Sequence, residues 1–222
     1  MLILRLKTQR ATRKGTMQKI LIIIFTIFFQ NSAFSLEKPS PLNFEKIPYK
    51  KSVKDSILDG NVFSESKVTD FEEQNKKMQS LNFSIAGLHK KSCNYALKTL
   101  SQYERYNKFL SFVEESSYDD KIGEITFRLS HVLLPYDMML IFKLPRIKEV
   151  GVYPFAFEIG FLKGLNGNIH VINHKNRCLF YSEASWKGPD TGVNAYIFEM
   201  FSQALSKLSM ETLFRISSTM SH

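Results

Sequence analysis

The sequence is poor in the residue types that build metal centres and covalent catalytic sites. Its 222 residues include two cysteines, five histidines and one tryptophan. His170 and His174 are four positions apart, but no third ligand stands at metal-binding spacing, so we expect no metal. No serine lies in a nucleophile elbow and no Cys–His pair is indicated, so covalent catalysis has no candidate nucleophile. Gly160, Gly164 and Gly167 lack the strand-to-helix context of a phosphate loop and are interpreted as turn residues, so no cofactor is expected either.

Acidic residues are absent from the first 35 positions, which hold six basic ones: Arg5, Lys7, Arg10, Arg13, Lys14 and Lys19. The formal charge of +9 therefore falls to +3 for the remainder, because removing six of the 30 basic residues leaves 24 against 21 acidic ones. This balance is ordinary for a globular domain. No basic run is interleaved with aromatic residues, so no nucleic-acid partner is expected.

A hydrophobic run long enough to span a bilayer is also missing. The apolar run Ile20–Phe29 covers about ten residues, well below the ~20 that a membrane helix needs. A basic start, this run and the small residues of Asn31–Ser35 predict a secretory signal peptide over residues 1–35, with Met17 as the true start. A transmembrane anchor is the alternative, and the absence of a cysteine at the cleavage site argues against a lipid anchor. The mature chain is therefore expected to begin near Leu36 and to be secreted or periplasmic.

Residues 36–70 are polar and contain three prolines, at positions 39, 41 and 48. This composition predicts a linker or a loosely attached arm, with the folded domain over residues 71–222. A few isolated apolar residues have the character to dock onto that domain: Ile57, Leu58, Val62 and Phe63. The stretch Thr69–Met78 has helical composition but little apolar stripe.

From Gln79 onward the hydrophobic pattern becomes regular. A strand is expected to end at Gly87, followed by a helical stretch, Cys93–Phe109, that a break near Ser101 or Asn107 divides into two. Six further extended segments then follow: one beginning at Phe112, Ile122–Leu133, Tyr136–Leu144, a strand carrying Tyr153 to Ile159, Asn168–Asn173 and Arg177–Lys187. Because successive strands are joined by tight turns, we expect antiparallel pairing and an α+β fold.

The last long helix is expected over Asn194 to about Ser209, with Asp190, Thr191 or Asn194 as its cap. One stripe of the helix is apolar and predicts a buried face: Ile197, Phe198, Phe201, Ala204, Leu205 and Leu208. The opposite stripe is polar: Glu199, Ser202, Gln203, Ser206 and Lys207. Past Ser209 the phase slips, so Met210, Leu213 and Phe214 form a second apolar face. That face either packs under a terminal loop or contacts a lipid or a partner.

The segment Leu100–Val113, with the sequence LSQYERYNKFLSFV, resembles a signature that follows the first strand in the START-like superfamily. This group is also called SRPBCC or helix-grip, and it includes polyketide cyclases, coenzyme-Q-binding proteins and lipid-transfer START domains. The resemblance covers about Gln79 to Ser217, with Asn107 in place of the usual proline. It implies a curved antiparallel sheet of about seven strands wrapped around the C-terminal helix, with a deep apolar cavity between them.

In such a fold the apolar face of each element would line the cavity. The expected lining residues are Phe127, Leu129, His131, Phe155, Phe157, Phe180, Trp186, Phe201 and Leu208. The fold also places the end of the first strand beside the start of the last, which implies a Cys93–Cys178 disulfide. Closing this loop would stabilise the chain by roughly 4–5 kcal/mol on the loop-entropy model.

The residues leave three functional hypotheses open. The first is a non-enzymatic exported protein that binds a lipid, a quinone or another apolar small molecule, with transient membrane contact. The second is an enzyme of polyketide-cyclase type, in which His131 and Asp137 act as acid and base. The third is an interaction module whose cavity is filled by side chains. An open apolar cavity favours binding, converging ionisable groups favour catalysis, and a solid interior favours the interaction module.

Overall fold

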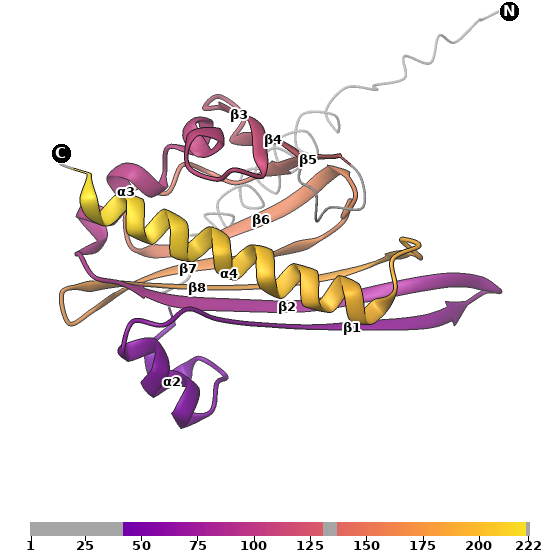
Figure 1. Ribbon diagram of the computed structural model, residues 1–222, viewed down its shortest axis with the longest axis horizontal. Helices are drawn as coiled ribbons and strands as arrows, with labels where there is room; N and C mark the ends of the chain where they lie inside the picture. Colours follow the sequence, from indigo (N-terminus) through magenta and orange to yellow (C-terminus); the bar gives the residue numbers. More distant parts are fainter. Residues whose placement is uncertain (1–41, 131–136, 221–222) are drawn as a thin grey trace, which may run out of the picture. The chain divides into compact units, whose positions relative to one another are not determined.

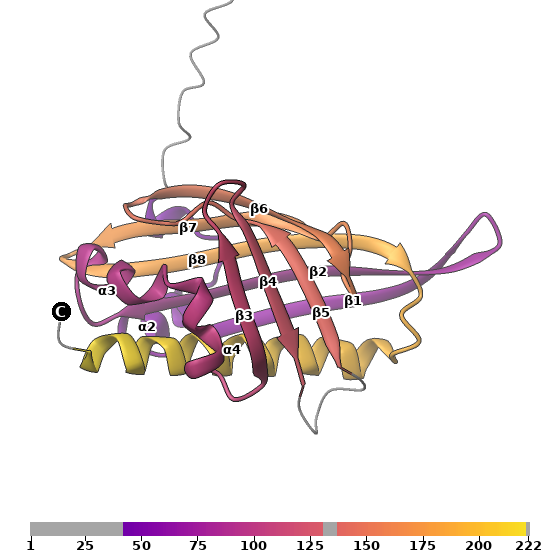
Figure 2. The same cartoon turned by 90° about the horizontal axis from the view of Figure 1, so that it is seen from above.

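Eight antiparallel strands form one sheet. The structure is a computed structural model that describes residues 42–130 and 137–220. All of these residues belong to one compact unit, Lys38–His222. The strand order is β1-β2-β8-β7-β6-β5-β4-β3 (Figure 2). The strands are β1 (Phe63–Glu73), β2 (Lys76–His89), β3 (Val113–Asp119), β4 (Glu124–Leu129), β5 (Met138–Lys143), β6 (Gly151–Gly160), β7 (Asn166–His174) and β8 (Arg177–Pro189). The predicted α+β helix-grip architecture is confirmed, with eight strands where about seven were expected.

The helical segments are few and differ greatly in length. They are η1 (Phe44–Lys46), α2 (Lys51–Leu58), α3 (Cys93–Leu100), η2 (Tyr103–Lys108) and α4 (Ala195–Thr219). The expected break near Ser101 is present, since α3 ends there and a 3₁₀ helix follows. Among the described residues, none of these helices has the length and apolar character required to cross a bilayer.

The β1–β2 hairpin corrects the expectation for the start of the domain. Residues 51–70, expected to be part of a linker or arm, contain α2 and most of β1, and the stretch expected to be helical forms the hairpin tip. Gln74 and Asn75 both have positive φ, as a two-residue hairpin turn requires. The strand is rich in charged residues, mainly acidic ones, because it lies at the sheet edge, where charged side chains remain in water. The composition of Thr69–Met78 therefore suggested a helix, whereas hydrogen bonding between β1 and β2 makes this stretch extended.

Residues 42–58 pack against the outer face of the sheet. Phe44, Ile47, Tyr49 and Ile57 are buried against Ala86, Leu88, Leu179 and Tyr181 of β2 and β8. Ile57 has no exposed surface, so the docking expected for this isolated apolar residue does occur. The described part of the predicted arm thus belongs to the domain and covers one end of the outer face.

Helix α4 lies on the inner face of the sheet and runs alongside the β1–β2 hairpin (Figure 1). Asn194 caps it, since its Oδ1 accepts a hydrogen bond from Tyr196 N at 2.9 Å. The helix continues without a break past Ser209 to Thr219. Its predicted N-terminal cap is therefore confirmed, whereas its predicted end is ten residues too early.

The polar stripe of α4 covers the edge strand instead of facing water. The Val68 N–H donates to Glu199 Oε2 at 3.1 Å, and the Ser66 hydroxyl donates to Glu199 O at 2.8 Å. The helix is consequently rotated relative to the prediction, so that Ile197 and Leu208 are 44% and 51% exposed. A hydrophobic pattern could not predict this rotation, because the free backbone groups of β1 attract the polar stripe.

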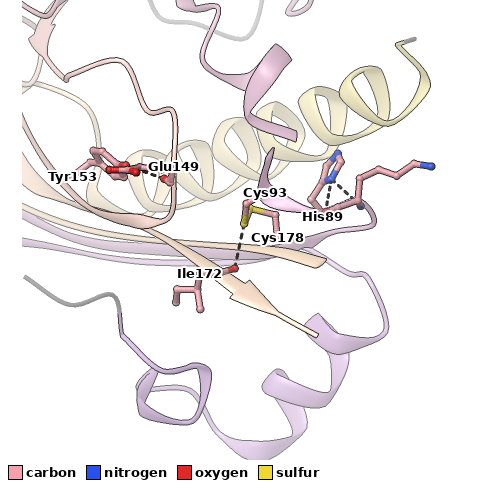
Figure 3. The surroundings of a disulfide bond; sticks show 7 residues. His89, Cys93, Glu149, Tyr153, Ile172 and Cys178 are labelled. Carbon is pink, nitrogen blue, oxygen red and sulfur yellow. Dashed lines mark hydrogen bonds between the residues drawn. A yellow bond between two sulfur atoms is a disulfide. The ribbon is translucent and has the colours of Figure 1, made fainter. Parts of the chain in front are cut away.

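The predicted disulfide is present between Cys93, at the start of α3, and Cys178, near the start of β8 (Figure 3). His89 and Cys178 are directly opposite one another in the β2–β8 pairing, which confirms the antiparallel register on which the expectation rested. Beside the disulfide, His89 Nε2 is 3.0 Å from the hydroxyl oxygens of Ser217 and Ser218, in the last turns of α4. The end of α4 is therefore fixed to the same region of the sheet.

Candidate ligand-binding cavity

A cavity of about 400 Å³ lies between the inner face of the sheet, α3, η2 and the C-terminal half of α4. Cavities that bind small molecules measure roughly 300–1,000 Å³, so this one is large enough for a ligand. Most of its lining is apolar. The aromatic members are Phe83, Tyr103, Tyr106, Phe127, Phe142, Phe155, Phe157, Phe180, Tyr181 and Phe214.

Contacts between the aromatic rings hold much of this wall in place. Tyr106 stacks on Phe127 with ring centroids 5.6 Å apart, and Phe142 stacks on Phe157 at 4.8 Å. Phe127 and Phe142 meet edge to face at 5.5 Å and join the two pairs into one row across η2, β4, β5 and β6. Such pairs contribute about 0.5–1.5 kcal/mol beyond the area that they bury. The wall is thus a fixed aromatic surface, which suits flat apolar ligands.

The second half of α4 forms the opposite wall. Met210, Leu213 and Phe214 line the cavity, and Phe214 packs on Phe180 at 5.4 Å. Gly87 of β2 allows this approach, since a Cβ there would lie 2.7 Å from Met210 Sδ and 3.0 Å from Phe214. These three apolar residues are the ones whose phase departs from the first stripe. Their second face therefore packs over the cavity, an assignment that the sequence interpretation did not make.

A few hydroxyl groups interrupt the apolar lining. Ser182 comes from β8, while Ser206 and Ser209 come from α4. The Ser209 hydroxyl donates to Leu205 O at 2.6 Å, and the Ser206 hydroxyl donates to Gln203 O at 3.0 Å. Because both helix serines donate to their own helix, their lone pairs can accept hydrogen bonds, but the Ser64 hydroxyl, 2.9 Å from that of Ser206, occupies one lone pair of Ser206. The cavity thus offers acceptors to a mostly apolar ligand that carries a hydroxyl or an amine.

The tyrosines of the lining have structural roles. The Tyr106 hydroxyl donates to Leu100 O at 2.7 Å, and the Tyr103 hydroxyl accepts from Ile147 N at 3.2 Å. Burial raises the pKa of both phenols well above the usual value, so both remain neutral. These bonds join η2 to the end of α3 and to the loop between β5 and β6, and the two phenols do not supply charge to the cavity.

The structure brings together four of the nine residues predicted to line the cavity: Phe127, Phe155, Phe157 and Phe180. Leu129 is buried in a separate cluster with Leu110, Phe112, Val113 and Met138. Trp186 packs on Phe198 in a third cluster. Phe201 is half-buried without lining the cavity, Leu208 is exposed, and His131 lies outside the described residues. The two helix residues were misplaced because the predicted rotation of α4 was wrong.

The residues proposed for acid–base catalysis are not assembled in the described part of the cavity. The Asp137 side chain is 58% exposed and lies 3.8 Å from Arg128 on the surface. Among the described lining residues, the only ionisable side chains are Tyr103, Tyr106 and Tyr181, and the Tyr181 hydroxyl donates to Glu183 on the outer face. In the same residues no group of three His, Cys, Asp or Glu could hold a metal ion.

Comparisons of the structure with solved structures find the same fold at low sequence identity. Ara h 8.0201 superposes with a TM-score of 0.50 at 8% identity, over 64% of this chain and 99% of that one. The Zhui aromatase/cyclase from Streptomyces sp. R1128 gives 0.50 at 9% identity, over 64% and 94% of the two chains. A conserved protein from Geobacillus kaustophilus gives 0.52 at 11% identity, over 64% and 97%. No family model and no curated protein matches the sequence. These similarities show a shared fold only. Any activity has to be inferred from the geometry of the cavity.

Proposed function

We propose that this chain, which has the helix-grip fold of the START-like superfamily, binds an apolar small molecule between its sheet and α4 without transforming it. The observation that carries the proposal is the cavity itself, about 400 Å³ in volume and lined mainly by aromatic rings. A protein that needed only a stable core would fill this space, because closely packed interiors keep few voids larger than a water molecule. The cavity therefore favours binding over an interaction module with a solid interior.

The aromatic rings and the few hydroxyl groups of the lining favour a mainly apolar, ring-containing ligand with one hydrogen-bond donor. Its rings would contact Phe142 and Phe157, and its donor would reach Ser182, Ser206 or Ser209. A lipid tail fits this lining less well than a flat molecule does, because aromatic faces prefer stacked or edge-to-face partners. We therefore place quinones and other ring-containing compounds ahead of acyl lipids.

The non-enzymatic assignment rests on the ionisable groups. Acid–base catalysis needs a group near the operating pH within hydrogen-bond reach of the substrate. The tyrosines of the described lining have raised pKa values and internal hydrogen bonds, which makes them poor acids and bases at neutral pH. The cyclase alternative would have to rely on residues other than the described lining.

Export and transient membrane contact stay predictions. The Cys93–Cys178 disulfide supports export, since disulfides persist mainly outside the cytosol. The apolar side chains that α4 exposes are the surface that a lipid contact would use: Tyr196, Ile197, Met200 and Leu208. N-terminal sequencing of the protein from an extracytoplasmic fraction should begin near Leu36, and a chain retaining Met17 in the membrane pellet would indicate an anchor instead.

Titration with naphthol, a fluorescent aromatic probe with one hydroxyl, tests the binding proposal. Two variants of β8 are matched: Ser182→Leu fills the cavity, whereas Ser185→Leu adds the same side chain on the outer face. We expect saturable binding to the wild type and to Ser185→Leu, and at least about tenfold weaker binding to Ser182→Leu, because the added side chain occupies ligand space. Equal affinity in all three proteins would contradict the proposed site.

A further inference from the structure

The outer face of the same strands carries a second hollow, of about 530 Å³, which we call the outer groove. The sheet register places Glu65, Ser84, Glu183 and Asn168 side by side across β1, β2, β8 and β7. A second row beside the first contains Lys67, Asn82, Ser185 and Asn166. Directly opposed residues of a sheet point to one face, so both rows form the floor of the groove. This floor is polar, in contrast to the aromatic cavity behind it.

The hydroxyl donors around the two glutamates are already used within the chain. The Tyr49 hydroxyl donates to Ser84 Oγ at 2.8 Å, and the Ser84 hydroxyl donates to Glu65 Oε1 at 3.2 Å. The Tyr181 hydroxyl donates to Glu183 Oε2 at 2.9 Å. In the described residues, one oxygen of each carboxylate, Glu65 Oε2 and Glu183 Oε1, thus accepts no hydrogen bond from the chain. The hydroxyl groups near the glutamates therefore leave one oxygen of each carboxylate open to a further donor.

His170 provides an independent sign that a donor is missing. Its side chain is 7% exposed, and neither ring nitrogen has a hydrogen-bond partner in the described part of the chain. Its Nε2 lies 3.8 Å from Glu183 Oε1, which is beyond hydrogen-bond range. Burial lowers the pKa of His170, which keeps the ring neutral at neutral pH, so it does not neutralise Glu183. Buried polar atoms normally have a partner, and a donor beside Glu183 Oε1 would lie close to this ring.

Charge determines the chemical class of the donor. The described floor carries two carboxylates and one ammonium group, that of Lys67. Its net charge is therefore −1, which favours a cation. The histidine and glutamates do not form a metal site, since no group of three such ligands exists in the described residues. We propose that the outer groove binds a small organic cation through a primary ammonium group held between Glu65 and Glu183. This site is distinct from the aromatic cavity and does not depend on the function proposed for it.

Calorimetric titration of the full chain with putrescine, a small diamine, tests this proposal. The diol of equal chain length, in which hydroxyls replace both ammonium groups, is the matched ligand. We expect saturable binding of putrescine and none of the diol. Glu65→Gln and Glu183→Gln should each weaken putrescine binding at least about tenfold, since each removes one charge-assisted contact. Both substitutions preserve side-chain shape at half-exposed or exposed positions, so the variants should fold.

Glu211→Gln on α4 is the control for net charge, because it removes the same charge on the other side of the sheet and should leave the affinity unchanged. In spectra of the imidazole groups, putrescine should shift the His170 signals and leave those of His89, which is buried under α4, in place. The proposal is overturned if putrescine shows no saturable binding or if the diol binds equally well. It is also overturned if Glu183→Gln binds like the wild type, or if Glu211→Gln is weakened to the same extent.

Discussion

The two faces of β8 have opposite chemistry within one short stretch of chain. Phe180 and Ser182 face the aromatic cavity, whereas Tyr181 and Glu183 face the outer groove. Alternation with a period of two lets a single strand serve both hollows, and a shift of one residue in its pairing would exchange them. The register of β8 between β2 and β7 therefore determines the composition of both proposed sites.

The faces also differ in how their side chains contribute to stability. On the inner face, Phe157 borders space, while Phe198 is buried against Trp186 and Phe161. On the outer face, residues 42–58 cover one end of the sheet and leave the polar rows open. Side chains of the same type should therefore contribute differently to the free energy of unfolding, depending on whether they border a cavity or a packed cluster.

The largest expected effect concerns the disulfide that joins β8 to α3. Replacing Cys93 and Cys178 by alanine should lower the free energy of unfolding by about 4–5 kcal/mol, because the disulfide closes a loop of 85 residues. Denaturant titration of the variant and of the reduced wild type measures the loss. Thiol labelling of the unreduced, denatured protein should find no free thiol, and two labelled cysteines would refute the pairing.

A matched pair of phenylalanines compares a solid part of the interior with the hollow part. Phe198→Ala should cost about 3–5 kcal/mol, as expected for a fully packed site. Phe157→Ala should cost clearly less, since its ring already borders a void, yet it should weaken naphthol binding. Thermal melts with and without naphthol measure both effects. Equal destabilisation by the two changes, with naphthol having no influence, would mean that the interior is solid.

Lowering the pH should reduce the free energy of unfolding, because histidines on both faces of the sheet become protonated. Burial lowers the pKa of His89 on the inner face, and of His170 and His174 on the outer face, below the usual histidine value of about 6.5. Because the folded state favours the neutral rings, their contribution to stability is complete above the unfolded pKa and is lost as pH falls through the folded pKa. His170→Gln should therefore lose less stability than the wild type on acidification. Unfolding curves at a series of pH values test this, and parallel losses in both proteins would contradict it.

The smallest expected effect tests the rotation of α4. Leu208 is half-exposed, so Leu208→Ser should change the free energy of unfolding by no more than about 0.5 kcal/mol. Leu213 lines the cavity and packs beside Leu129 and Met138, so Leu213→Ser should be more destabilising. A larger loss for Leu208→Ser, measured by denaturant titration, would restore the face that the hydrophobic stripe predicted.

Local pattern predicted the parts of the fold that local physics decides. The alternation of Phe155 and Phe157 was correct, and one of the three candidate caps, Asn194, does cap α4, because pleat and capping depend on near neighbours. The disulfide followed from the antiparallel order of the resembled fold. The β1 strand was missed because its Lys and Glu residues suit an exposed edge as well as a helix.

The residues with which α4 lines the cavity could not be predicted from local sequence pattern. Its rotation depends on hydrogen bonds between Glu199 and the free edge of β1, which are far apart in the sequence. The phase slip at Met210 was visible, but the strand residue that it packs against, Gly87, is apparent only in three dimensions. The outer groove depends on register across four strands, and no motif in the sequence marks it.

Mass spectrometry of an organic extract of the purified protein tests the central claim most directly. We expect an apolar, ring-containing compound at a ratio near one per chain in the wild type and in Ser185→Leu, and its depletion in Ser182→Leu, whose new side chain fills the cavity. Extracts of all three proteins with no such compound, or with the same amount of it, would contradict the claim that the space between the sheet and α4 is a ligand site.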